Sequence, residues 1–235
     1  HCKPFTLAVK FPCPVKRFRN KDFAVFKLAS NIITIFKSWK NFFMETKLEV
    51  RSFDSPLSLE EFGKIPRRPI YVVLDNLRSA FNVGSIIRTA DCALVEKVYC
   101  CGITAHPPHK KLDKTSLGAL SYVPWEHRET ALEIAYELKV KRIPVYALEL
   151  TNKSRVIWDV SFPLPIAVVL GNEALGVSEE VLQVADEIVE IPMLGYKNSI
   201  NVAVAFGIVV YEIQRQYWKE FPKESWIRFD EYSIR

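Results

Sequence analysis

Largely apolar runs alternate with helical patterns along residues 70–218. The apolar runs predict five strands, at residues 70–74, 98–101, 143–148, 166–170 and 188–191. The run at 166–170 contains no polar residue, as expected for a strand that is covered on both faces. This alternation favours an α/β fold, with a parallel sheet and helices on both of its faces.

Capping residues and helical spacing predict the helices between these strands. Ser58-Leu59-Glu60-Glu61 is a capping-box pattern that begins a short helix. Asn82 can cap a helix that runs to about Leu94, and Ser178 can cap one that runs to Ala185. Further helices are expected over residues 129–140 and 199–218.

The chain divides into four segments. Residues 69–218 form the α/β domain, residues 44–68 a short helical lead-in and residues 219–235 a tail. Residues 1–43 contain nine Lys or Arg and one acid, whereas the formal net charge of the whole chain is +5, so the remainder is mildly acidic. We interpret residues 1–43 as a basic N-terminal extension that is disordered or not native. The alternatives are a targeting segment and an RNA-binding arm.

Cysteine and histidine positions argue against metal and disulfide chemistry. The five cysteines form no Cys-x-x-Cys spacing, which fits a reducing cytosol. Cys92 lies on the apolar side of a predicted helix, so we expect a buried inert thiol rather than a nucleophile. His106 and His109 flank two prolines and are interpreted as loop residues, not metal ligands. Since no apolar stretch reaches the ~18 residues of a spanning helix, we predict a soluble cytoplasmic protein.

Three polar segments, at residues 82–91, 170–176 and 191–205, punctuate the apolar pattern. Each follows a predicted strand, and ligands of parallel sheets bind beyond the carboxyl ends of the strands. A small-ligand site is therefore expected where these segments meet. The chain has no Gly-x-Gly-x-x-Gly, Walker-type or Gly-x-Ser-x-Gly motif in these segments, which disfavours ordinary dinucleotide, P-loop and hydrolase chemistry.

The same segments resemble the three signature motifs of the SpoU/TrmH branch of the SPOUT RNA methyltransferases. The matching stretches are Asn82–Asp91, Leu170–Gly176, and Ile191–Gly195 leading into Ser199–Val202, in the family's order. The resemblance covers about residues 69–218. It implies methyl transfer from S-adenosylmethionine to a ribose 2′-hydroxyl of RNA, a parallel-sheet α/β knot with a C-terminal trefoil, and a homodimer.

The resemblance also implies where the cofactor binds, between the second and third motifs. The cofactor-binding residues expected there are Leu148, Glu149, Leu170, Gly171, Asn172, Ile191, Met193, Gly195 and Ile200. Gly171 is expected to let the main chain approach closely, and Gly195 to permit a turn that a Cβ would forbid.

The catalytic residues that the resemblance implies are Arg88, Asn82, Glu173, Ser199 and Asn201. Arg88 is the first choice, either as the base that activates the hydroxyl or as a clamp. Because a protonated arginine cannot accept a proton, we favour a clamp on the neighbouring phosphate and on developing oxyanion charge. The alternative is a surface salt bridge to Asp91 or Glu96.

The other catalytic candidates also have structural alternatives. Glu173 is expected to order the second motif by accepting backbone N–H bonds, or to be an exposed loop acid. Ser199 and Asn201 can cap the last helix as well as act at the site. The nearly continuous apolar run at residues 202–210 suggests a subunit interface or a central core helix.

Basic clusters in the loops are the candidates for RNA contact. They are Arg78, Lys110, Lys111, Lys114, Lys153, Arg155 and Lys197. tRNA is the favoured substrate, because the chain lacks room for the N-terminal RNA-binding domain often fused to rRNA-directed relatives. The alternatives are an rRNA substrate, a base methyltransferase of the wider superfamily, and an inactive RNA-binding protein of the same fold.

Overall fold

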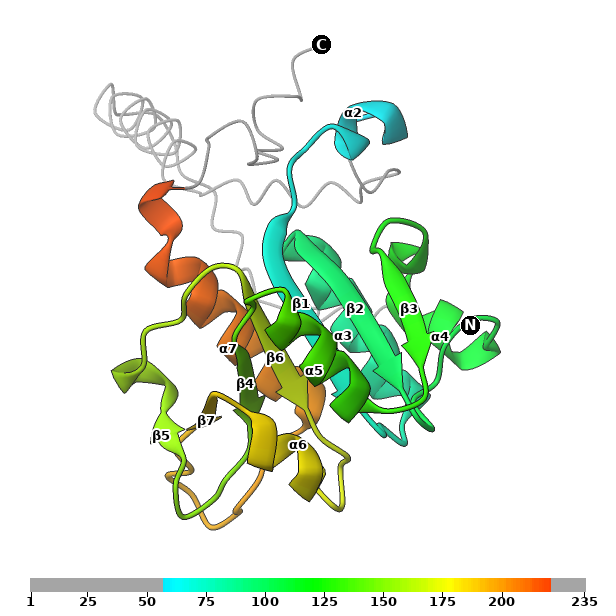
Figure 1. The fold of residues 1–235 in the computed structure, drawn as a ribbon. Coiled ribbons are helices and arrows are strands. Elements are labelled where there is room, and N and C mark those ends of the chain that lie inside the picture. Colours follow the sequence, from blue (N-terminus) through cyan, green and yellow to red (C-terminus); the bar gives the residue numbers. More distant parts are fainter. Residues whose placement is uncertain (1–56, 221–235) are drawn as a thin grey trace, which may run out of the picture. The chain divides into compact units, whose positions relative to one another are not determined.

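The fold is that of a computed structural model, which describes residues 57–220. The predictions for residues 1–43, for most of the lead-in and for residues 221–235 lie outside this range. Within it, the structure has a single seven-stranded sheet with helices on both faces (Figure 1).

All neighbouring strands of the sheet are parallel, in the order β3-β2-β1-β6-β4-β7-β5. The strands are β1 (Arg68–Asp75), β2 (Val95–Cys101), β3 (Trp125–Arg128), β4 (Val145–Leu148), β5 (Arg155–Val156), β6 (Ile166–Leu170) and β7 (Glu187–Glu190). The five predicted strands are confirmed. The sequence did not predict β3 and β5, because both are short edge strands without a continuous apolar run.

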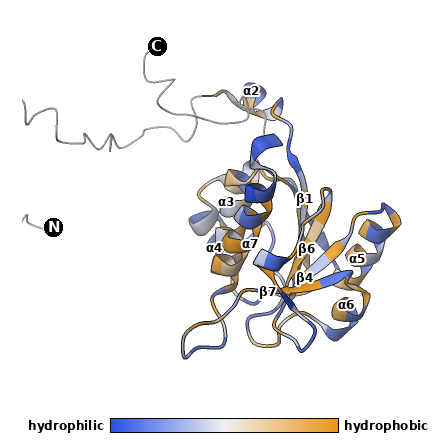
Figure 2. Ribbon diagram, turned by 90° about the vertical axis from the view of Figure 1, so that its left-hand side faces the viewer, coloured by the Kyte–Doolittle hydropathy of each residue, from blue (hydrophilic) through white to orange (hydrophobic). Residues whose placement is uncertain are grey.

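Within residues 57–220, six α-helices cover the sheet or precede it. They are α2 (Leu59–Gly63), α3 (Ala80–Cys92), α4 (Lys110–Ser116), α5 (Ala131–Val140), α6 (Glu179–Val184) and α7 (Val202–Gln216). Figure 2 shows α3, α4 and α7 on one face of the sheet and α5 and α6 on the other. The capping box of α2 is present, but α4 was not predicted, since its seven residues include three lysines.

Strand β6 lies at the centre of both core layers. Ile166, Val168 and Leu170 pack in the layer that contains residues of α3 and α7, whereas Ala167 and Val169 pack in the layer under α5 and α6. Since side chains alternate between the two faces of a strand, burial on both sides explains the uninterrupted apolar run. No helix within residues 57–220 has the length and apolar character needed to cross a bilayer.

Two helix caps differ from the prediction. The N-cap of α3 is Ser79, whose hydroxyl accepts from the Asn82 amide at 3.3 Å, so the expectation that Asn82 caps this helix was wrong. Asn82 instead lies in the first turn, where its side chain reaches other loops. Ser178 does occupy the N-cap of α6, but its side chain makes no capping bond, and its amide donates to Asp75 Oδ2 at 2.8 Å.

Cys92 also differs from the prediction. It is exposed rather than buried, because α3 ends there and its last turn lies at the surface. Desolvation nevertheless raises the pKa of its thiol, as does the neighbouring Asp91 carboxylate. The thiolate form of Cys92 is therefore disfavoured. This is a chemical reason to expect that Cys92 is not a nucleophile, although the thiol is exposed.

Candidate active site

Glu173, in the loop after β6, binds the start of α3. Its carboxylate accepts from the Arg78 amide at 2.8 Å, the Ser79 amide at 3.0 Å and Asn82 Nδ2 at 2.8 Å. One of these donors, the Ser79 amide, belongs to the N-cap of α3 and is among the unpaired amides of a helix N-terminus, where a negative charge is favoured. The contacts join the loop after β1 to the loop after β6, as the role expected for Glu173 requires.

Asn201 extends this network to the loop after β7. Its Nδ2 donates to Asn82 Oδ1 at 3.0 Å, while its Oδ1 caps α7 by accepting from the amides of Ala203 and Val204. Asn82 thus donates to Glu173 and accepts from Asn201. Side chains from all three polar segments meet in one hydrogen-bonded chain, which confirms that these segments converge.

Burial raises the pKa of the Glu173 carboxyl, but hydrogen bonds from Arg78, Asn82 and Ser79 outweigh it and hold the pKa below its ordinary value of 4.5. A carboxylate with a lowered pKa stabilises the folded state above its ordinary pKa. This contribution is lost as the pH falls through the folded pKa, which places the loss below pH 4.5.

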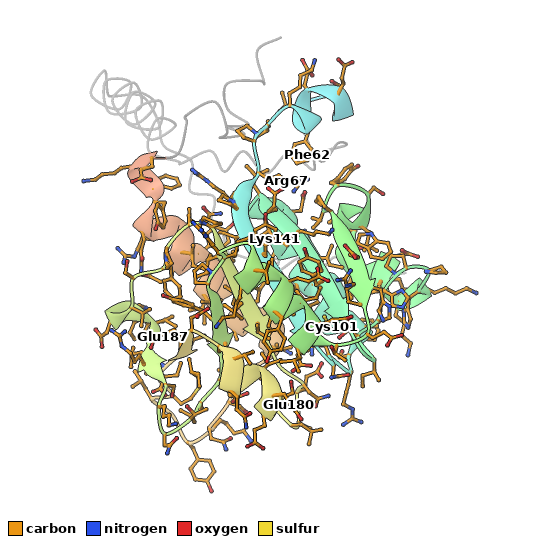
Figure 3. The ribbon with its side chains drawn as sticks, viewed as in Figure 1. Phe62, Arg67, Cys101, Lys141, Glu180 and Glu187 are labelled. Atoms are coloured by element: carbon orange, nitrogen blue, oxygen red, sulfur yellow. The ribbon has the colours of Figure 1, made fainter. Side chains whose placement is uncertain are left out.

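Glu173→Gln should therefore make the free energy of unfolding fall less steeply with pH below 4.5 than in the wild type. Urea unfolding at several pH values measures this slope, with Glu180→Gln as the control because Glu180 is exposed on α6 (Figure 3). Equal slopes for the Glu173 variant and the wild type would contradict a charge-dependent contact.

The loop after β6 is a tight turn held by Asn172. Its backbone exchanges two hydrogen bonds of 2.9 Å with Gly176, and its Oδ1 accepts from the amides of Ala174 and Leu175. Its Nδ2 donates to the Asn76 carbonyl at 2.7 Å. Asn172 is only 7% exposed, so its side chain shapes the loop from within.

Glycine is required at two positions of this turn. A Cβ on Gly171 would lie 2.1 Å from the Gly176 carbonyl carbon and from the Val177 nitrogen. Gly176 has a φ of +73°, and a Cβ there would meet the Glu149 carboxylate at 2.3 Å. The close main-chain approach predicted at Gly171 is therefore present. The main chain of Gly171 approaches the main chain of Gly176 and Val177 in the same loop.

Gly195 does not have the steric role that was predicted. A Cβ there would meet no heavy atom within 4 Å, and its φ is not in the left-handed region. The loop at residues 194–200 is exposed, so a side chain at this position has open space.

A cavity of about 480 Å³, including its open mouth, lies beside the network. Its lining comes from the carboxyl ends of β4 and β7, from the loop before α7 and from the first turn of that helix: Leu148, Glu149, Leu150, Glu190, Ile191, Met193, Asn198, Ser199, Ile200 and Ala205. The lining combines apolar walls with two carboxylates and contains no lysine, arginine or histidine.

Five of the nine predicted cofactor residues line this cavity: Leu148, Glu149, Ile191, Met193 and Ile200. Leu170, Gly171, Asn172 and Gly195 do not. Leu170 is 1% exposed and packs in the core, because it is still part of β6. Leu150, Glu190, Asn198 and Ala205 also line the cavity and were not among the predicted residues, although each lies within a few residues of a predicted one in the sequence.

The remaining candidates lie outside the cavity, except Ser199, which lines it. Arg88 is exposed in the second half of α3, and Lys110, Lys111 and Lys114 are exposed on α4. Arg78, Lys153 and Lys197 are exposed in loops. Arg155 is engaged in the fold, since it donates to the Asp159 carbonyl at 2.8 Å and pairs with Glu187 at 3.4 Å.

The order of the three segments and their convergence in one hydrogen-bonded network agree with a comparison against known families. Residues 69–211 match the model of the SpoU rRNA Methylase family. The chain belongs to the SpoU rRNA methylase family. Among similar SpoU-type proteins is the tRNA (guanosine(18)-2'-O)-methyltransferase of Thermus thermophilus, 34% identical over 161 residues that cover 68% of this chain and 82% of the relative. The Aquifex aeolicus protein of the same name is 32% identical and is covered over 74% of its length.

Solved SpoU structures have the same fold. The SpoU methyltransferase AviRb from Streptomyces viridochromogenes superposes with a TM-score of 0.61 at 27% identity, over 69% of this chain and 65% of that one. AviRb was also solved in complex with the cofactor AdoMet, and that structure has a TM-score of 0.60 at 26% identity over the same shares of the two chains.

Proposed function

We propose that this protein transfers a methyl group from S-adenosylmethionine to a ribose 2′-hydroxyl of structured RNA. The observation that carries the proposal is the Glu173–Asn82–Asn201 network, which joins the three SpoU motif loops beside the cavity. Relatives named as tRNA 2′-O-methyltransferases, and a related structure holding AdoMet, support the same activity.

The cavity suits S-adenosylmethionine, which combines an apolar adenine ring with a positively charged sulfonium. Leu148, Ile191 and Ile200 offer apolar surface to a ring, and Glu149 and Glu190 offer negative charge to a cation or acceptors to ribose hydroxyls. When bound, the cofactor supplies the methyl group.

Both Glu149 oxygens accept backbone N–H bonds, from Leu150 and Val177, at 2.9 Å each. This carboxylate is therefore held in one orientation at the rim of the cavity.

Positioning supplies much of the catalysis, because methyl transfer needs the hydroxyl oxygen in line with the methyl carbon. Asn82, Glu173 and Asn201 fix the loops, and Ser199 lies at the cavity beside the reacting hydroxyl. Arg88 clamps the adjacent phosphate and stabilises charge that develops on the oxygen. Since arginine stays protonated, it does not remove the hydroxyl proton.

tRNA is the substrate that the comparisons favour, because the curated relatives include several tRNA (guanosine(18)-2'-O)-methyltransferases. An rRNA substrate is the second candidate, since a related structure is named an rRNA methyltransferase. Unmodified tRNA transcripts and rRNA fragments, each incubated with the protein and labelled cofactor, separate the two: faster incorporation into tRNA is expected.

An inactive RNA-binding protein of the same fold is the rival from another class. Calorimetric titration with S-adenosylmethionine discriminates the two, because a protein that has lost methyl transfer need not keep the cofactor site. The proposal expects saturable binding, and the absence of measurable binding would favour the rival.

The proposal includes a homodimer formed through α7. Val204, Ile208 and Tyr211 repeat at helical spacing and are 56%, 36% and 52% exposed on one face of this helix. An apolar stripe on a helix that already buries its other face suits a second copy of the chain.

Ile208→Glu should convert the dimer to a monomer, because a carboxylate buried without a partner is costly. Sedimentation equilibrium measures the mass, and Val140→Glu is the control, since Val140 is 85% exposed at the end of α5 on the other side of the sheet. A dimer that survives the Ile208 substitution would place the interface elsewhere.

A C-terminal trefoil knot and a cytoplasmic location complete the proposal. The strand order supports the knot, because the chain leaves β7 near one edge and α7 returns to α3, where Gln214 Nε2 donates to the Ala93 carbonyl at 2.6 Å. The free thiols of Cys92, Cys100 and Cys101 support a reducing compartment.

A further inference from the structure

Three rings lie together on β3 and in the loop after β2. The His106 ring is centred 4.1 Å from the His127 ring, at an interplanar angle of 35°, and 6.4 Å from the Trp125 ring, at 26°. Trp125 and His127 are two residues apart on β3 and therefore project from the same face of the sheet. His106 comes from the loop after β2 and lies against both of them.

Hydrogen bonds to carbonyl groups fix the two imidazoles. His106 Nδ1 lies 3.0 Å from the Pro107 carbonyl oxygen, and His127 Nε2 lies 3.1 Å from that of Gly102. Because a carbonyl oxygen can only accept, each ring nitrogen is the donor. These bonds hold the two rings in place. His127 is exposed, whereas His106 and Trp125 are half-buried behind it.

Positive charge lies on the same side of the sheet as the ring stack. Helix α4 begins directly after His109, and its lysines 110, 111 and 114 are exposed, with Asp113 as its one acid. Trp125 packs against the core layer that contains Leu112 of α4, so the stack and this helix lie on the same side of the sheet. The nearby Glu126 is neutralised by ion pairs to Lys97 and Arg128.

His127 lies near the carboxyl ends of the strands, the same end of the sheet that carries the candidate active site. Cys101, the last residue of β2, marks this end in Figure 3. β3 is separated by two strand spacings, about 10 Å, from β1, whose following loop carries the catalytic network. The cavity lies further along the sheet, at β4 and β7, four to five strand spacings or about 19–24 Å from β3, so a nucleotide a few positions from the target ribose can reach the stack.

We propose that His127, supported by His106 and Trp125, stacks an unpaired nucleobase of the RNA substrate while the α4 lysines contact neighbouring phosphates. Stacked rings beside a basic surface are typical of proteins that bind unpaired nucleotides with little sequence preference. The inference rests on the proposed function. It adds that the RNA extends over α4 and β3, and that a nucleotide near the target is unpaired.

Equilibrium binding of a fluorescein-labelled, unmodified tRNA transcript to the full chain tests this inference. His127→Ala should weaken binding about 5- to 150-fold, which corresponds to the loss of one base–ring stack. His127→Phe keeps a ring that can stack but loses the hydrogen bond to Gly102, so it should bind within about threefold of the wild type. Ser121→Ala, at an exposed position outside the stack, is the matched control and should bind like the wild type.

Unchanged binding by His127→Ala, or a Phe variant as weak as the Ala variant, would overturn the inference. A titration with S-adenosylmethionine accompanies each variant and should give the wild-type affinity. Failure of the proposed function looks different, since the wild-type protein would then bind no S-adenosylmethionine or transfer no methyl group to RNA, whatever the His127 variants bind.

Discussion

Alanine at position 88 is expected to lower kcat about 100- to 1,000-fold while the Kd for S-adenosylmethionine stays within about twofold of the wild type. A loss of this size is typical when one group that stabilises developing oxygen charge is removed. Cofactor affinity should survive, because Arg88 is exposed on α3 and does not line the cavity. Single-turnover methylation and calorimetry measure the two quantities separately.

Arg88→Lys is the matched variant. It keeps the positive charge but loses the two-pronged geometry that suits a phosphate, so its kcat should lie between those of the wild type and the alanine variant. A collapse of cofactor affinity in Arg88→Ala would contradict the assignment of Arg88 to the RNA side. Unchanged turnover of Arg88→Ala would show that Arg88 is a surface residue without a role in catalysis.

Alanine at position 171 is expected to abolish cofactor binding and to lower the melting temperature. The new Cβ would lie 2.1 Å from backbone atoms of Gly176 and Val177, which cannot rotate away as a side chain can. The turn must open, and it carries Glu173 and therefore the link between the motif loops. Overpacking costs about 1–3 kcal/mol, which lowers Tm by about 2–12 °C in a domain of this size.

Gly195→Ala is the control for this substitution. It adds the same methyl group in the neighbouring motif loop, where no heavy atom lies within 4 Å, so Tm and cofactor affinity should both stay near wild type. Equal behaviour of the two alanine variants would show that the tight turn after β6 is not needed for the site.

The sequence predicts the centre of this fold better than its edges, for a physical reason. Strand β6 contributes to both core layers, so burial on both faces imposes a continuous apolar run. The edge strands β3 and β5 are covered less and keep polar residues such as Glu126 and Arg155. The predicted N-cap of α3 was three residues too late in the sequence. Ser79 and Asn82 are both good capping residues, and only the backbone conformation decides between them.

The sequence predicts those parts of the site in which each residue lies in one loop directly after a strand. The motif order locates the Glu173–Asn82–Asn201 network, since each member is a polar residue in a segment that follows a strand. The role of Gly195 was not predictable, because glycine serves both strained turns and exposed loops. The ring stack of His106 and His127 also escaped prediction, because it forms only when β2 and β3 pair in parallel register.

Identification of the methylated atom in RNA tests the central claim most directly. Unmodified tRNA is incubated with the protein and cofactor carrying a heavy methyl group, and its nucleosides are then analysed by mass spectrometry. The account predicts that the label appears on ribose, as a 2′-O-methylnucleoside whose neighbouring phosphodiester resists alkali. Label on a nucleobase, or no label while the same protein binds S-adenosylmethionine and RNA, would contradict it.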